Sequence, residues 1–153
     1  GMSSRLFTEI RDKLGLAYSI HSYIDHLLDS GSMIIYAGVD PKNLSTAIRA
    51  ILEQLSLLKQ PIPETELSKA KELIKGRLLL RMEDTGDVAA WAGGQEILTG
   101  RVLGVDQIIS IIDAITSEEL RQLACELLVG KHLRLALVGP VTKEDSLEEL
   151  LKL

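Results

Sequence analysis

Residues 16–39 read LAYSIHSYIDHLLDSGSMIIYAGV, and this stretch decides the fold. Its two halves, Leu16–Leu27 and Ser32–Val39, are rich in β-branched and aromatic residues with a rough spacing of two, which is typical of strands. Between them, Asp29-Ser30-Gly31 is a turn signal. We therefore predict an antiparallel hairpin.

A helix is expected immediately before this hairpin. Leu6, Ile10 and Leu14 recur at steps of four, which places them on one apolar stripe of an amphipathic helix over Met2–Leu14. Gly15 follows at the position where glycine commonly ends a helix. The chain therefore begins with a helix that leads directly into the first strand.

Helical periodicity dominates the chain after the hairpin. The strongest apolar face has seven members: Leu44, Ala47, Ile48, Ile51, Leu52, Leu55 and Leu58. Four further helices are expected over Glu64–Met82, Val88–Leu98, Val105–Ala114 and, from the capping box Thr116-Ser117-Glu118-Glu119, through Val129.

The end of the chain predicts one more strand and one more helix. Leu133–Gly139 is a mostly apolar run that favours a third strand, and Ser146–Leu153 has the length of a short final helix. Strands and helices do not alternate as in a doubly wound sheet. The predicted fold class is α+β, a small antiparallel sheet with several helices packed on it.

Composition limits the classes of function. The 153 residues contain 46% hydrophobic and 25% charged residues, which is typical of a globular chain, and we expect a single domain over residues 2–153. The net charge of −5 and the lack of a Lys/Arg stripe argue against a nucleic-acid partner. No apolar run approaches the ~20 residues of a membrane span. With one cysteine and no visible signal peptide, we expect a cytoplasmic location.

The residues with catalytic potential form no complete site. His21, His26 and His132 lack the spacing of a zinc motif, so a structural or exposed role is expected for each. Cys125 lies in an apolar helical context and is interpreted as a core residue. Gly93-Gly94 do not follow a strand, which favours close helix packing over a phosphate-binding loop.

A family resemblance is carried by residues 2–20, MSSRLFTEIRDKLGLAYSI. This string closely resembles the second, non-zinc half of insulinase/pitrilysin-type metallopeptidases, including processing-peptidase-like bacterial members. Its most specific part is Arg-x-x-x-Gly-Leu-Ala-Tyr, from Arg11 to Tyr18. The resemblance continues through Glu66–Gly76, Glu83–Thr85, Gln95–Arg101, Ile115–Leu120 and Val138–Pro140.

The resemblance implies a clamshell of two α+β halves that close around a peptide. In that family an inverted His-x-x-Glu-His motif and a distal Glu bind zinc in the other half, where the motif Glu acts as general base. Nothing in this chain matches that motif. The chain resembles the later part of the C-terminal, substrate-clasping half, so no metal is expected here. Zinc is expected in a partner N-terminal half, on the same longer chain or on a separate subunit.

Two residues are carried over from the family's signature. Arg11 and Tyr18 match the arginine and tyrosine that reach across the cleft to the substrate near the zinc. A guanidinium and a phenol can both donate hydrogen bonds to a substrate carbonyl. A second interpretation stays open, in which Arg11 is ion-paired with Glu9 or Asp12 and Tyr18 is a half-buried strand aromatic.

The function implied by the resemblance is the C-terminal portion of a zinc-dependent metalloendopeptidase, inactive alone. The alternatives are a non-catalytic partner subunit or protein-interaction module derived from that family and, more remotely, a degenerate product that only folds. The chain starts late in the family's pattern, so a strand of the sheet is expected to be missing. An exposed sheet edge predicts a homodimer of the isolated chain. In the intact enzyme the segment before residue 1 is expected to cover that edge.

Overall fold

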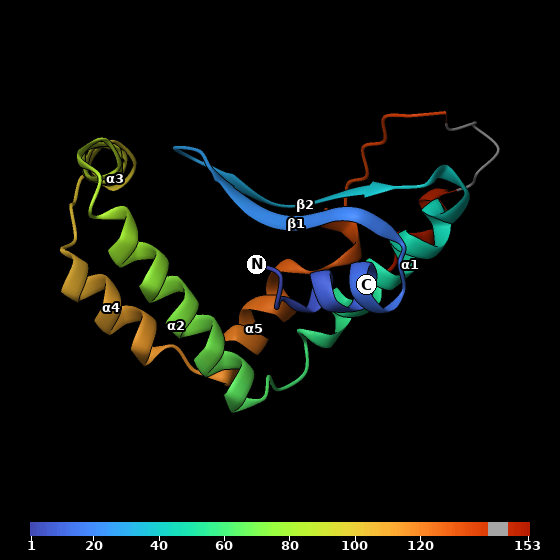
Figure 1. Cartoon of the computed structure of the whole chain (residues 1–153), viewed down its shortest axis with the longest axis horizontal. Coiled ribbons are helices and arrows are strands. Elements are labelled where there is room, and N and C mark those ends of the chain that lie inside the picture. Colours follow the sequence, from blue (N-terminus) through green and yellow to red (C-terminus); the bar gives the residue numbers. More distant parts are fainter. Residues whose placement is uncertain (141–146) are drawn as a thin grey trace. The chain divides into compact units, whose positions relative to one another are not determined.

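The computed structural model describes residues 1–140 and 147–153 (Figure 1). The chain divides into two compact units, which are described separately below. The first unit is Gly1–Gln60 with Gln122–Leu153, and the second is Pro61–Arg121. Among the described residues, no helix combines the length and the apolar character that a membrane span requires.

The first unit is built on the predicted hairpin. β1 (Ala17–His26) pairs antiparallel with β2 (Gly31–Val39), in a register that sets His21 opposite Tyr36. Gly31 closes the hairpin, where a Cβ would lie 2.8 Å from the carbonyl oxygen of Asp25. The hairpin prediction is therefore confirmed, and the small antiparallel sheet with its helices confirms the α+β class.

The first helix is shorter than predicted and has a different geometry. η1 (Phe7–Lys13) is a π-helix, preceded by a helical turn at residues 5 and 6. It does not begin at Met2, because the hydroxyl oxygen of Ser4 accepts a hydrogen bond from the Phe7 N–H at 3.3 Å and so caps the helix start. Gly15 has a φ of 61° and ends the helix as predicted.

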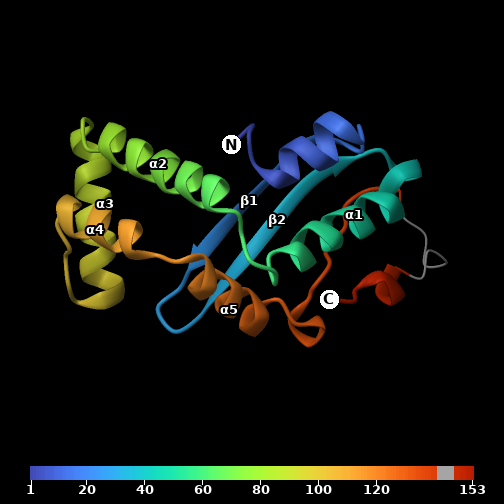
Figure 2. The same ribbon diagram turned by 90° about the horizontal axis from the view of Figure 1, so that it is seen from below.

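One face of the hairpin is covered by two helices. α1 (Leu44–Leu57) follows the short 3-10 turn η2 (Pro41–Asn43), and both η1 and α1 lie on the same side of the sheet (Figures 1 and 2). The buried residues at this contact are Ile10, Ala17, Ile20 and Ala50. Ile10 is fully buried, which fixes η1 against β1.

α1 also forms a second core with the end of the chain, and Ile35 of β2 packs against both cores. The buried residues of this second core are Ile48, Leu52, Leu55 and Leu147. Leu147 belongs to η5 (Leu147–Leu150), a 3-10 turn in the place of the predicted final helix. The expected start of that helix, Ser146, lies outside the described residues.

The predicted third strand does not form. After the 3-10 turn η3 (Gly130–His132), residues 133–138 carry no strand structure, and β1 and β2 are the two strands of the described sheet. The apolar run predicted a strand, but a strand also needs a neighbouring backbone to pair with. Instead, Arg134 donates to the carbonyl oxygens of Lys131 at 2.9 Å and Leu133 at 2.7 Å, so its charge is satisfied locally.

The second unit is helical, as predicted. Its elements are α2 (Glu64–Arg81), α3 (Thr85–Thr99), α4 (Val105–Ala114) and the start of α5 (Ser117–Leu127). α3 begins earlier than expected because the Asp84 carboxylate accepts from the Asp87 N–H at 2.8 Å. The buried apolar residues of this unit are Leu67 and Ile112.

The capping box at the start of α5 is confirmed. The Glu119 carboxylate accepts hydrogen bonds from the Thr116 N–H at 2.8 Å and from the Thr116 hydroxyl at 2.7 Å, and the Glu119 N–H donates back to that hydroxyl at 3.2 Å. The Thr116 hydroxyl and N–H hold the pKa of Glu119 below its ordinary value. The carboxylate is therefore favoured at the helix start.

Two packing predictions are wrong. Cys125 is exposed on α5 and is not a core residue. Gly93 and Gly94 have no heavy atom of the described residues within 4 Å of an added Cβ, so they do not mediate close helix packing there. At Gly93 and Gly94 the small-residue pattern predicts a contact with a neighbouring helix that the described residues do not provide.

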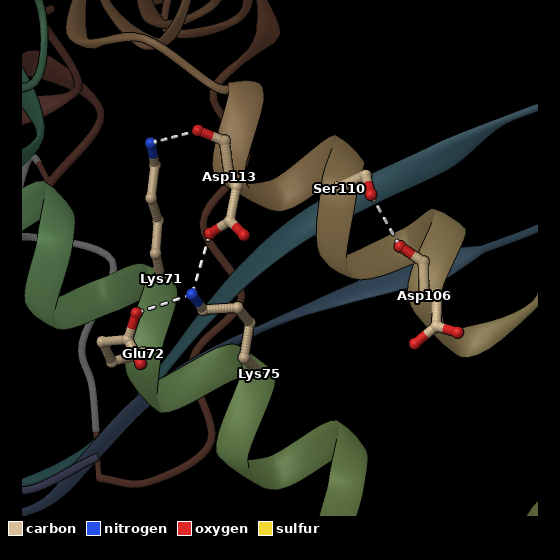
Figure 3. A network of polar contacts seen from close by, with 6 residues as sticks. All are labelled: Lys71, Glu72, Lys75, Asp106, Ser110 and Asp113. Atoms are coloured by element: carbon tan, nitrogen blue, oxygen red, sulfur yellow. Dashed lines mark hydrogen bonds and ion pairs between the residues drawn. The ribbon is translucent and has the colours of Figure 1, made fainter.

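Two lysines of α2 hold the end of α4 (Figure 3). Lys71 donates to the carbonyl oxygen of Asp113 at 2.9 Å, and Lys75 donates to the Asp113 carboxylate at 2.8 Å. Lys75 also pairs with Glu72 at 2.6 Å. Cations at a helix C-terminus complement the helix dipole. The Asp113 and Glu72 carboxylates raise the pKa of Lys75 above its ordinary value of 10.5.

We predict an alkaline instability that depends on Lys75. A raised pKa in the folded state stabilises the chain below the unfolded pKa, and this contribution is lost as the pH rises through the folded pKa. As the pH rises above 10.5, the melting temperature of the wild-type chain should therefore fall by more than that of the Lys75→Met variant. Lys69→Met on the same helix, at an exposed position, is the matched control. Equal pH profiles for wild type and Lys75→Met by circular dichroism would contradict this role.

Candidate substrate-binding site

The two residues singled out by the sequence lie together in the structure. Arg11 comes from η1 and Tyr18 from the start of β1, and the Arg11 guanidinium carbon lies 5.9 Å from the centre of the Tyr18 ring. This distance is within the range of a cation–π contact. The Tyr18 side chain is 87% exposed, so the interpretation of Tyr18 as a half-buried strand aromatic is wrong.

The chain reversal at Gly15 brings these residues together. The left-handed conformation of Gly15 turns the chain back, and the Leu16 N–H donates to the carbonyl oxygen of Ile10 at 2.9 Å. The first residues of β1 consequently run back beside the last turn of η1. Burial of Ile10 and Ala17 in one cluster holds this arrangement.

A β-bulge accounts for the exposure of Tyr18. Ala17 pairs with Val39 and Ser19 pairs with Gly38, so β1 contains one extra residue, Tyr18, at this point. A bulge shifts the alternation of side chains, and Ala17 and Ile20 are both buried although they are three residues apart. Tyr18 is thereby directed to solvent at the end of the strand.

The polar groups of this pair are available to a ligand. Glu9, one of the two carboxylates considered as a partner of Arg11, pairs with Lys13 at 2.6 Å. Within residues 1–140 and 147–153, the Arg11 guanidinium makes no ion pair, and neither it nor the Tyr18 hydroxyl makes a hydrogen bond. The interpretation of Arg11 as an ion-paired surface residue therefore fails for the described residues. Its N–H donors and the phenol O–H remain available for an acceptor.

Sequence reasoning missed a third member of this site. The Arg11 guanidinium carbon also lies 4.7 Å from the centre of the Phe7 ring, closer than to Tyr18. The signal was present, because Phe7 and Arg11 are four residues apart and such pairs meet on a helix surface. We name Phe7, Arg11 and Tyr18 the arginine cluster.

A group of stacked rings lies farther along the hairpin. His21 stacks on Tyr36 across the ladder, with ring centres 5.0 Å apart, and on Tyr23 at 6.0 Å. Tyr23 and Tyr36 are about half exposed. The contacts of His21 are therefore those of an exposed aromatic stack on the sheet.

The described residues do not fit a zinc ion. In the described ranges, no group of three or more His, Cys, Asp and Glu side chains is arranged to hold a metal. The arginine cluster itself contains a cation and two aromatic rings, which are not zinc ligands. The chemistry of this site is consequently hydrogen-bond donation and positive charge.

Comparison with known proteins identifies the class. Residues 1–74 match the family model described as the Peptidase M16 inactive domain. An uncharacterized zinc protease of Mycobacterium leprae is 34% identical over 154 residues, covering 100% of this chain and 34% of the relative. One from Bacillus subtilis is 38% identical over 140 residues, covering 91% of this chain and 34% of the relative. The chain thus spans about a third of these relatives.

Solved structures agree with this class. A protease from Helicobacter pylori superimposes with a TM-score of 0.66 and 27% identity, over 82% of this chain and 30% of that one. A chain of Complex III2 from Candida albicans shares the fold, with a TM-score of 0.73 at 20% identity over 81% of this chain and 30% of that one. Residues 1–74 thus match the inactive domain of the M16 peptidase family, and relatives that are similar to most or all of this chain are named zinc proteases.

Proposed function

We propose that this chain is the substrate-clasping part of a zinc-dependent metalloendopeptidase, inactive alone, and that Arg11 and Tyr18 bind the substrate peptide. The observation that carries the proposal is the arginine cluster. Two residues of a family signature, seven positions apart in sequence, lie in contact at an exposed strand end with their donors unused. The family assignment and the relatives named zinc proteases support this function.

Hydrogen-bond donation is the chemistry that the arginine cluster can contribute. During peptide hydrolysis, negative charge develops on the carbonyl oxygen of the bond that is cleaved. The Arg11 guanidinium and the Tyr18 O–H would donate hydrogen bonds to that oxygen or to a neighbouring substrate carbonyl. Donors fixed by the fold need little reorganisation at the moment of reaction. Zinc chemistry would belong to a partner N-terminal half that carries His-x-x-Glu-His.

The first test of this function is substitution of the two donors in the longer peptidase that contains this chain. Removal of one well-placed donor costs roughly 100- to 1,000-fold in kcat in a well-studied hydrolase. We expect losses approaching this range for Arg11→Ala and Tyr18→Phe, with unchanged zinc content because neither residue is a ligand. Peptide cleavage and bound zinc would be measured on the same preparations.

Matched controls make this test specific. Arg49→Ala removes an exposed arginine from α1, and Tyr36→Phe removes a phenol from the same hairpin. Both controls should cleave peptides like the wild type. Full activity of Arg11→Ala and Tyr18→Phe would refute the assigned role. A native polypeptide without a His-x-x-Glu-His half would instead favour the alternative, a non-catalytic partner subunit or interaction module.

The zinc assignment gives a separate prediction for the chain itself. The purified 153-residue chain should retain no stoichiometric zinc after dialysis and should cleave no peptide. The physical reason is the lack of a suitable ligand group among the described residues. Elemental analysis by mass spectrometry measures this directly. One zinc bound per chain would overturn the proposed division of labour between the halves.

We also propose that the isolated chain forms a homodimer through the hairpin edge. In the described residues, β1 and β2 pair only with each other, so each has an edge with unpaired backbone groups. We expect light scattering at micromolar concentration to give twice the chain mass of 16.8 kDa. Ile24→Lys, at a 60% exposed strand position, should favour the monomer, whereas Ile97→Lys on α3 should not. A monomeric wild type would refute edge pairing.

A further inference from the structure

Phe7 makes the closest ring contact to Arg11. The guanidinium carbon lies 4.7 Å from the centre of the Phe7 ring and 5.9 Å from that of Tyr18. Phe7 is the only phenylalanine of the chain, which is poor in aromatic residues. A ring at this distance attracts the cation through its negative face. Phe7 therefore restricts where the Arg11 head group can lie.

An aromatic partner differs from a carboxylate in what it leaves available. A carboxylate orients an arginine by accepting hydrogen bonds from its N–H groups, and those donors are then occupied. A ring contacts the flat face of the guanidinium, while the five N–H donors lie around its perimeter. Because Glu9 pairs with Lys13 at 2.6 Å, the described residues orient Arg11 by rings and leave its donors open.

Local structure holds the Phe7 ring in place. Phe7 is half-buried, and its N–H donates to the Ser4 hydroxyl at 3.3 Å at the start of η1. Ile10, one position before Arg11, is fully buried in the core of the first unit. Phe7 and Arg11 thus project from a turn of η1 that the core fixes at Ile10.

We propose that Phe7 is a positioning residue that presents the Arg11 guanidinium to the substrate peptide with its hydrogen-bond donors free. This inference rests on the proposed function, because it assigns Phe7 a role through Arg11. Phe7 itself need not touch the substrate. What Phe7 contributes is the orientation of Arg11 before the substrate arrives, which lowers the entropic cost of binding the transition state.

The test compares aliphatic and aromatic replacements of Phe7 in the longer peptidase. Phe7→Leu removes the ring and should lower kcat by about 2- to 30-fold, the range that corresponds to one cation–π contact, while KM changes little. Phe7→Tyr keeps the ring and should retain nearly full activity. Phe7→Met is a second aliphatic variant in case Phe7→Leu does not fold, as judged by circular dichroism.

A double substitution separates positioning from a general structural effect. If Phe7 acts through Arg11, Phe7→Leu should cause no further loss of kcat when Arg11 is already alanine. In the 153-residue chain alone, the side-chain N–H resonance of Arg11 should lose the Phe7 part of its ring-current shift in Phe7→Leu and keep it in Phe7→Tyr. This spectroscopic readout does not depend on peptidase activity.

The outcomes distinguish the positioning role of Phe7 from the proposed function. Additive losses in the double variant, or equal activity of Phe7→Leu and wild type, would overturn the positioning role while the large effect of Arg11→Ala leaves the proposed function intact. An unaffected Arg11→Ala enzyme would overturn both proposals. An Arg11 resonance that is the same in Phe7→Leu and wild type would show that the ring does not hold the guanidinium, and would also overturn the positioning role.

Discussion

Burial of Ile10 against the start of β1 is the contact on which the first unit depends. Ile10 is fully buried in the core, and it lies one position before Arg11. The Leu16 N–H donates to the Ile10 carbonyl, so the same residue contributes its side chain to the core and its backbone to the chain reversal. Without this anchor, the last turn of η1 would have no fixed position relative to β1, and Arg11 and Tyr18 would not meet.

Much of the fold was predictable because it is local. The hairpin depends on β-rich runs around Gly31, and the start of α5 depends on the Thr116 cap, whose partner is three residues away. The caps at Ser4 and Asp84 are equally local, but the predicted starts of η1 and α3 missed them. The missing third strand involves contacts between distant segments. The run at residues 133–138 has the composition of a strand, but pairing requires a neighbouring backbone, which composition does not encode.

The arginine cluster, too, was only partly predictable from the sequence. Arg11 and Tyr18 could be named from a family signature, and the predicted helix that leads directly into the first strand places both near its junction with that strand. The bulge at Tyr18 was not predictable, because one extra residue in β1 becomes visible only when the pairing with β2 is known. The contact of Phe7 with Arg11 was also missed, although the spacing of the two residues was visible in the sequence.

Orientation by rings suits a chain whose ligand comes from outside. In a site that lies within one chain, a carboxylate can hold an arginine in place, because the two side chains stay paired while the site acts. A clasping surface must keep its donors unoccupied until a peptide arrives, and still limit the motion of a long side chain that carries substantial rotamer entropy. In the proposed role, contact with Phe7 and Tyr18 satisfies both requirements, since the two rings limit where the guanidinium can lie and accept no hydrogen bond from its N–H groups. In the proposed role, an arginine that no carboxylate of the described residues pairs with keeps its donors for the peptide.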